Sequence, residues 1–232
     1  MGTTLKQYNI EYGILKFNTA EDYKLGAKLI RGFCSRMFGQ EHIEFHNHFH
    51  KKGEDVIPGF PVIQYRYDTI LGLKHGKDIL KSIYEEIPYF MPKTNRHREV
   101  KLESVDFEIK EDVIGVTDEM IRYRFENYMA LNPKNYETYM SLEGEKQYKF
   151  LNNLLKIHVS SLFAGLELKG VSPKYFKIRG SFKERTEVKY KKRDTILFSG
   201  TFETNLILPD NLGIGNQISK GYGQIRRVNI EE

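Results

Sequence analysis

The chain has 232 residues, of which 40% are hydrophobic and 13% aromatic, and its formal net charge is +5. This composition can fill a core and excludes a disordered chain, and the length fits one large domain or two of roughly 100 residues each. The single cysteine, Cys34, excludes a disulfide framework and a cysteine-based zinc site, and no apolar run approaches the roughly 18 residues of a membrane span, so we expect a cytoplasmic protein without membrane contact.

The first predicted elements are a strand and a helix. Residues 7–17 favour a strand, and Thr19 is then the expected N-cap of a helix that has Asp22 at its third position. Apolar residues recur at every fourth position after it, namely Leu25, Leu29, Phe33 and Met37. This spacing places them on one face of a helix and predicts that the face is buried.

A histidine-rich segment, EHIEFHNHFHKKG, follows over residues 41–53 and holds His42, His46, His48 and His50. Three interpretations are open: a metal site, a nuclease centre or a polar loop. In an extended chain the last three histidines would point to one face, and alternate histidines can chelate zinc. No carboxylate or cysteine follows at a ligand-like spacing, so we predict no metal. The letters HNH carry no weight, because HNH nucleases scatter these residues along a ββα unit.

The rest of the first half predicts a hairpin, a helix and a strand. The hairpin comes from two strand-like runs, residues 60–67 and 69–76, with Asp68 between them. Residues 77–87 favour a helix, and residues 98–110 alternate as a strand.

The second half repeats this order with other lengths. We predict a strand over residues 119–131, a long helix from about 143 to 166, and strands over 175–190 and 194–208 that are joined at KKRD. A glycine-rich stretch then replaces or shortens the last helix.

Each half therefore approximates the order β-α-β-β-α-β of a ferredoxin-like domain. We predict an α+β protein of two tandem ferredoxin-like domains, covering residues 1–95 and 96–232, with a C-terminal glycine-rich loop. The duplication is inferred from element order and not from sequence identity.

A basic block lies between Lys169 and Arg193. Ten Lys or Arg residues stand there against Glu184 and Glu187, a local charge of +8, so the other 207 residues together carry −3. Aromatic residues lie among these charges at Tyr175, Phe176, Phe182 and Tyr190. Such a block predicts a surface that binds a polyanion, and a solvated hairpin is the alternative.

The stretch GIGNQISKGYG, residues 213–223, places four glycines in eleven residues, ahead of Arg226 and Arg227. Glycine lets backbone N–H groups approach an anion, and Lys220 adds charge, so a phosphate-binding loop is one interpretation. A plain glycine-rich turn is the other. The spacing fits neither the Walker loop nor the dinucleotide-binding fingerprint.

Residues 208–227, LPDNLGIGNQISKGYGQIRR, resemble the C-terminal glycine-rich signature of the RAMP superfamily. Within it, the sequence is most similar to the CRISPR-associated endoribonucleases of the sixth Cas family, which cut precursor CRISPR RNA within its repeats. KFN at 16–18, FHNH at 45–48 and the later IQYRY also resemble the b-type subgroup of that family.

The resemblance implies two ferredoxin-like folds with RNA held across them and metal-independent cleavage without a cofactor. It also implies a histidine near the end of the first helix as general acid or base, which ranks His46 and His48 first and equal. The expected partners are CRISPR repeat RNA, other Cas proteins or a second copy of the chain.

RNA can be cut without a metal because its own 2′-hydroxyl can attack the adjacent phosphate, given a base, an acid and positive charge. Histidine suits the proton transfers because its pKa is about 6.5, and each transfer is worth about 100- to 10,000-fold in rate. We predict that His46 or His48, ranked equal, transfers the proton, that Lys52 stabilises the phosphate charge, and that Tyr65 orients the ribose or stacks a base. The products would be a 2′,3′-cyclic phosphate and a 5′-hydroxyl.

The predicted RNA-binding residues are Lys189, Lys191, Lys192, Arg193, Gly213, Gly215, Lys220, Gly221, Gly223, Arg226 and Arg227. The isolated His75, His97 and His158 are predicted to be structural. Two other functions stay open: a non-catalytic subunit of the same superfamily that holds crRNA in an effector complex, and a metal-dependent hydrolase.

Overall fold

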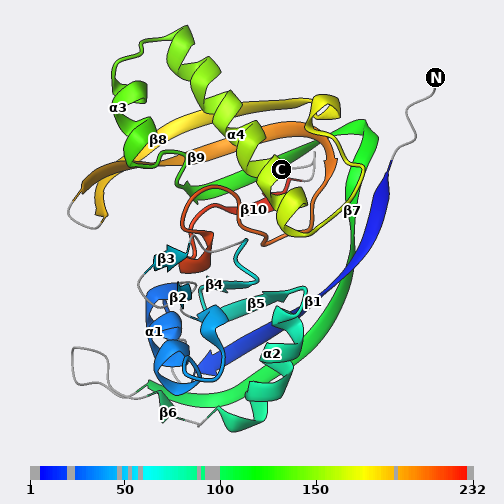
Figure 1. The fold of residues 1–232 in the computed structure, drawn as a ribbon, viewed down its shortest axis with the longest axis vertical. Helices are drawn as coiled ribbons and strands as arrows, with labels where there is room; N and C mark the ends of the chain where they lie inside the picture. Colours follow the sequence, from blue (N-terminus) through cyan, green and yellow to red (C-terminus); the bar gives the residue numbers. More distant parts are fainter. Residues whose placement is uncertain are drawn as a thin grey trace. The chain divides into compact units, whose positions relative to one another are not determined.

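The computed structural model describes residues 6–19, 24–45, 49–51, 54–56, 60–87, 90–91, 100–190 and 193–228. Its contacts divide the chain into two compact units (Figure 1). The N-terminal unit comprises Glu11–Glu111 together with Ser219–Gly221. The C-terminal unit comprises Met1–Ile10, Asp112–Ile218 and Tyr222–Glu232. The strands β1 (Gln7–Thr19) and β7 (Val100–Tyr128) each contribute residues to both units.

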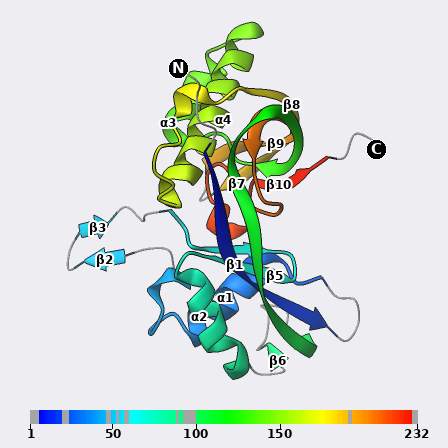
Figure 2. The ribbon, with the colours of Figure 1, turned by 90° about the vertical axis from the view of Figure 1, so that its right-hand side faces the viewer.

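The N-terminal unit has the strand order of a ferredoxin-like domain. Its sheet is antiparallel in the order β4-β5-β1-β7, which is the second, third, first and last strand of the β-α-β-β-α-β sequence. Figure 2 shows both of its α-helices on the same side of β1 and β5. The further elements of this unit are α1 (Ala27–Met37), β2 (Phe49–Lys51), β3 (Glu54–Val56), β4 (Ile63–Arg66), β5 (Thr69–Leu73), α2 (Gly76–Ile83) and β6 (Phe90–Met91), with 3₁₀ turns η1 (Ile43–Phe45) and η2 (Tyr84–Glu86).

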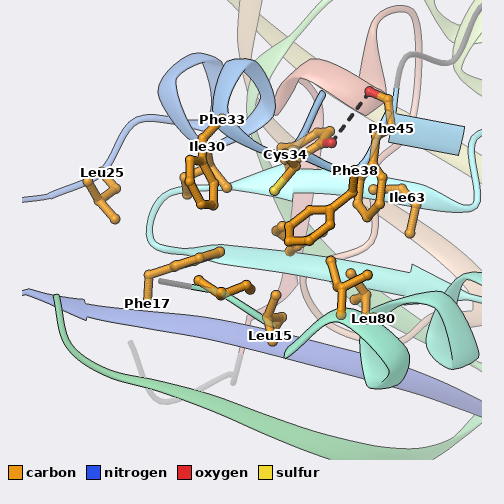
Figure 3. Packing of buried hydrophobic residues seen from close by; sticks show 14 of the residues in the cluster. Leu15, Phe17, Leu25, Ile30, Phe33, Cys34, Phe38, Phe45, Ile63 and Leu80 are labelled. Carbon is orange, nitrogen blue, oxygen red and sulfur yellow. Dashed lines mark hydrogen bonds between the residues drawn. The ribbon is translucent and has the colours of Figure 1, made fainter. Parts of the chain in front are cut away.

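One apolar core holds these elements together (Figure 3). Leu15 and Phe17 reach it from β1, and Phe33 and Cys34 reach it from α1. Leu80 of α2 packs into the same cluster. Because burial of each large apolar side chain contributes roughly 1.5–3 kcal/mol, the two helices are held to the sheet mainly by this core.

The predicted hairpin is confirmed as β4 and β5, but the first helix starts later than we predicted. Thr19 ends β1 and does not cap a helix, since α1 begins at Ala27 after Gly26. Between them, the backbone N–H of Leu25 donates to Asp68 Oδ1 at 2.5 Å, and Asp68 N–H donates to Leu25 O at 3.0 Å. These bonds hold the chain before α1 against the hairpin turn, so it cannot join the helix.

The buried face of α1 also differs from the predicted one. Ile30, Phe33 and Cys34 are buried, whereas Met37 is 48% exposed. The four-residue repeat that we read in the sequence therefore marked only part of the core-facing side. Cys34 is a buried core residue, and burial raises the pKa of its thiol above the usual value.

The C-terminal unit repeats the same strand order. Its antiparallel sheet runs β10-β7-β9-β8, again the last, first, third and second strand of the motif. Both views show its α-helices on one side of this sheet (Figures 1 and 2). The elements are α3 (Pro133–Met140), α4 (Glu145–Gly165), η3 (Pro173–Tyr175), β8 (Ile178–Tyr190), β9 (Arg193–Ile207), η4 (Ile218–Lys220) and β10 (Gln224–Arg227).

The second half follows the prediction except in three places. The described residues 100–110 and the residues 119–128 of the two predicted strands belong to one strand, β7, of 29 residues. Because that strand contributes to both units, the division along it falls after Glu111 and not near residue 95, and a further division falls in β1 after Ile10. Helix α3 was missed, although Asn132 caps it and accepts hydrogen bonds from the backbone N–H groups of Lys134 and Asn135. The single 3₁₀ turn η4 stands where the last helix of the motif would lie.

Aromatic rings fill the space between the second sheet and α4. Phe125 contacts Tyr128, Phe182 and Phe202, with ring centroids 5.1–6.2 Å apart. The hydroxyl of Tyr128 lies 2.7 Å from Nδ1 of His158 on α4. This agrees with a structural role for His158, and burial lowers the pKa of its imidazole from 6.5 to about 4.

We expect His158 to make the protein less stable in acid. The unfolded chain binds this proton near pH 6.5 and the folded protein only near pH 4. The stability that the neutral imidazole of His158 contributes is therefore fully present above pH 6.5 and is lost as the pH falls toward 4. After allowance for partial exposure, the loss should be about 2 to 3 kcal/mol across this window. Urea unfolding at pH 7 and pH 4.5 measures it.

The variant His158→Gln should flatten that pH dependence. His75→Gln is the matched control, because the His75 side chain is 58% exposed, and it should keep the wild-type dependence. If the free energy of unfolding of His158→Gln depended on pH as in the wild type, His158 would not be the cause of the acid sensitivity.

In the part of the chain that the structure describes, no helix is both long and apolar enough to cross a membrane.

Candidate functional site

Hydrogen bonds and core packing fix the chain as far as Phe45, the residue before the predicted catalytic His46. After α1, the backbone N–H of His42 donates to Phe38 O at 2.8 Å, and the turn η1 ends at Phe45. Phe45 is fully buried, and its ring lies 6.0 Å from that of Phe38. Its carbonyl accepts a hydrogen bond from Ser35 Oγ at 3.0 Å. The point from which residue 46 departs is therefore fixed by the core (Figure 3).

His46, His48 and Lys52 lie outside the described residues. Immediately after the two histidines, β2 pairs with β3 in an antiparallel ribbon in which His50 is opposite Asp55 and Lys51 is opposite Glu54. The structure thus places an anchored turn before the histidines and a two-stranded ribbon after them. Their roles stay a prediction.

Tyr65 does not have the position that we predicted for it. It is 1% exposed within the core of the N-terminal unit, so its ring cannot stack on a base or contact a ribose. Its hydroxyl donates to Phe45 O at 3.5 Å, and burial raises its pKa well above 10. We therefore assign Tyr65 to positioning: it supports the residue before His46 and touches no substrate.

The variant Tyr65→Phe tests this correction. It keeps the ring and removes only the long hydrogen bond to Phe45, so we expect less than about a fivefold change in cleavage rate. Loss of a direct proton-transfer group would instead cost about 100-fold or more. Single-turnover cleavage measures it, with Ser35→Ala as a comparison that removes the shorter bond to the same carbonyl.

The glycine-rich segment is folded against the C-terminal sheet by its own hydrogen bonds. The N–H of Ile214 donates to Gly223 O at 2.9 Å, and the N–H of Gly223 donates to Asn127 O at 3.1 Å. Asn216 donates from its backbone and side chain to Met129 O. These N–H groups already donate hydrogen bonds to carbonyl groups within the protein. The glycine-rich segment therefore has a structural role and is not only a set of donors for an anion.

Two of the predicted glycines are required by close packing. Gly215 has φ +94°, and a Cβ there would lie 2.6 Å from the Tyr128 ring. Gly223 has φ +68°, and a Cβ there would lie 1.8 Å from Ile214 O. Gly213 forms an isolated bridge with Gln224. A side chain at Gly215 or Gly223 would displace the segment, so these glycines set its shape.

Lys220 and Gly221 belong to the same unit as the histidine segment. The short stretch Ser219–Gly221 clusters with the N-terminal unit although the residues on both sides of it do not. A Cβ on Gly221 would lie 2.7 Å from Cβ of Ala27, the first residue of α1, and 3.1 Å from Tyr65 O. The tip of the glycine-rich segment therefore packs on α1 and β4, the elements that frame Phe45.

The basic hairpin is present as β8 and β9. Lys189 is exposed and lies opposite Asp194 in the strand register, and the backbone of Arg193 lies opposite Tyr190. Lys191 and Lys192 lie outside the described residues. In β10, Arg226 and Arg227 are exposed, and the backbone N–H of Arg227 donates to Asp210 Oδ1.

Sequence reasoning missed two further exposed arginines on β7, Arg122 and Arg124. The signal was available, because the alternation in IRYRFE places both on one face of a strand while Tyr123 and Phe125 are buried. No group of three or more possible metal ligands occurs among the residues that the structure describes. The histidine cluster falls largely outside that set.

The fold identifies the class of protein. The strand sets β4-β5-β1-β7 and β10-β7-β9-β8 have the same ferredoxin-like order within one eight-stranded sheet, and a glycine-rich segment precedes the last strand, β10, as in the tandem RAMP fold. Models of the Cas6b N-terminal domain and the Cas6b C-terminal domain match residues 8–111 and 115–228. The chain belongs to the Cas6b family.

Solved structures agree over nearly the whole chain. A crystal structure of Cas6b is 26% identical, with a TM-score of 0.80 over 95% of this chain and 100% of the other. A crystal structure of the CRISPR RNA processing endoribonuclease Cas6b is 24% identical, with a TM-score of 0.70 over the same shares. An uncharacterized protein of Methanocaldococcus jannaschii is 33% identical over 123 residues, which are 52% of this chain and 81% of that protein.

Proposed function

We propose that this protein is a metal-independent endoribonuclease that cleaves precursor CRISPR RNA within its repeats. The observation that carries the proposal is the match of both units to Cas6b domains, together with the name of one similar structure as a CRISPR RNA processing endoribonuclease. These comparisons support cleavage of CRISPR RNA. The mechanism rests on the chain's own residues.

In the proposed mechanism, the 2′-hydroxyl at the scissile position attacks the adjacent phosphate. His46 and His48 are the proposed groups for the two proton transfers, one from that hydroxyl and one to the leaving 5′-oxygen. Lys52 stabilises the charge on the phosphorane. The fixed carbonyl of Phe45 limits where these residues can lie, because a catalytic group must stay within hydrogen-bond reach of the proton it transfers.

The glycine-rich segment and the basic hairpin hold the RNA in this proposal. Lys220 belongs to the unit that carries the histidines, so it is the proposed contact for a phosphate close to the cleavage site. Lys189, Lys191, Lys192 and Arg193 bind phosphates further along. The proposed partners are the repeat RNA and its crRNA product, with other Cas proteins or a second copy of the chain in the assembly.

Incubation of the protein with end-labelled repeat RNA in excess EDTA tests the proposal. We expect cleavage at one position that leaves a 2′,3′-cyclic phosphate and a 5′-hydroxyl. A repeat RNA with a single 2′-deoxy nucleotide at that position is the control, and it should bind but stay intact. Cleavage of the deoxy substrate, or dependence on a divalent metal, would indicate a different reaction. Tight binding without cleavage would indicate a crRNA-holding subunit.

A further inference from the structure

The helix-free face of the C-terminal sheet carries a row of positive and hydroxyl side chains, of which the predicted RNA contacts include only Arg226. Strand register places Arg226 of β10 opposite Arg124 of β7, Arg124 opposite Thr201 of β9, and Thr201 opposite Ser181 of β8. Side chains directly opposite in neighbouring strands lie on the same face. One straight row of four residues therefore crosses the whole sheet.

This face lies away from α4. The backbone N–H of Gly180 donates to Asn152 Oδ1 of α4 at 2.7 Å, so α4 packs on the face to which Gly180 and Phe182 belong. Residues of the row alternate with these, and Arg124, Arg226 and Ser181 are exposed. In Figure 2, α3 and α4 both lie on one side of β7 and β9.

The pair Arg124 and Arg226 is the main feature of the row. Like charges directly opposite each other destabilise a sheet, so a bound anion would relieve the repulsion between these two arginines. No ion pair joins either guanidinium to a carboxylate among the residues that the structure describes. A shallow depression lies beside them, lined by Arg124, Gln224, Arg226 and one carboxylate, Glu126, so the local charge of its lining is +1.

The neighbouring Arg122 differs from this pair. Its guanidinium donates to Glu203 Oε1 on β9 from Nε at 3.1 Å and from Nη2 at 2.6 Å. The carboxylate of Glu203 thus neutralises most of the positive charge of Arg122. Lys183, opposite Ser199, adds an exposed positive charge further along the same face.

We propose that this face, centred on Arg124 and Arg226, binds the sugar–phosphate backbone of RNA without reading its bases. Guanidinium groups and hydroxyls donate to phosphate oxygens, as Thr201 and Ser181 can here. Base stacking needs exposed aromatic rings, and in these strands Tyr123, Phe125, Phe198, Phe202 and Phe182 all face the α4 side. The inference rests on the proposed function in taking RNA as the ligand, and it adds a second, sequence-independent contact surface.

The double variant Arg124→Gln/Arg226→Gln tests the proposal by binding of repeat RNA and of an unrelated single-stranded RNA of equal length over a range of KCl. We expect affinity to fall about tenfold at low salt for both RNAs, and the slope of log K against log salt to become shallower by about 1.4, because each lost phosphate contact on a single strand removes about 0.7. Arg124→Lys/Arg226→Lys keeps the charge and should keep most of the slope.

Lys146→Gln/Lys149→Gln is the matched control, since both lysines are exposed on α4, on the other side of the sheet, and the charge change is the same. It should leave the slope unchanged. An unchanged slope in the arginine variant, or a loss confined to the repeat RNA, would contradict the inference. Tighter binding of poly-glutamate than of the unrelated RNA at equal charge concentration would also contradict it and indicate a surface for acidic proteins.

Cleavage by the wild-type protein is measured in the same preparations and separates the two proposals. If the wild type cleaves the repeat while the arginine variant keeps the wild-type slope, only the inference about this face fails. If the wild type binds no RNA, the proposed function fails as well.

Discussion

Replacement of His46 or His48 by alanine is expected to lower the rate constant of repeat cleavage by about 100- to 10,000-fold, the usual worth of a positioned general acid or base. The dissociation constant for repeat RNA should change by less than about threefold, because one histidine contributes little to phosphate binding compared with the many Lys and Arg residues. Single-turnover cleavage and filter binding on the same variants measure the two quantities. This combination separates proton transfer from RNA binding.

Imidazole added to the medium provides a second readout. If the missing group transferred a proton, imidazole should restore part of the cleavage in the affected variant, whereas a residue that only shapes the loop would show no rescue. His42→Ala is the matched control, because His42 precedes the anchored turn and its ring packs at 6.1 Å from that of Phe45. Full activity in both His46→Ala and His48→Ala would exclude these two histidines from the chemistry.

The order of elements was readable because it depends on local patterns. The hairpin at Asp68, the long helix α4 and the pair β8–β9 each follow from alternation or helical spacing within a short window. The start of α1 was not readable, because bonds between Leu25 and Asp68, distant in the sequence, hold the preceding chain extended. Similarly, no local signal shows that residues 100–110 and 119–128 are one strand, since its continuity depends on partners in both units.

The candidate site was readable in its residue types but not in their surroundings. Tyr65 lies in a strand-like run beside charged residues, and only the packing of α1 against β4 shows that it is buried. The glycines were expected to present N–H groups to an anion. Gly215 and Gly223 instead allow the backbone to pass close to Tyr128 and Ile214, which sequence spacing alone cannot distinguish from anion binding.

That packing predicts a large effect for Gly223→Ala. The backbone there has φ +68°, where a Cβ is strained, and the new methyl carbon would lie 1.8 Å from Ile214 O. Strain at positive φ and overpacking together should lower the free energy of unfolding by about 3 to 5 kcal/mol. The bonds from Ile214 N–H to Gly223 O and from Gly223 N–H to Asn127 O would be lost or displaced with it. Urea unfolding at pH 7 measures the change.

Gly144→Ala separates the two causes. Gly144 precedes α4 with φ +49°, but a Cβ there would meet nothing within 4 Å, so this variant carries the backbone strain without the clash and should cost only about 1 to 2 kcal/mol. Equal losses in the two variants would mean that the glycine-rich segment relaxes freely around a side chain. Such freedom would contradict the view that hydrogen bonds and close packing fix the segment before RNA arrives, and would return its glycines to the role of flexible donors.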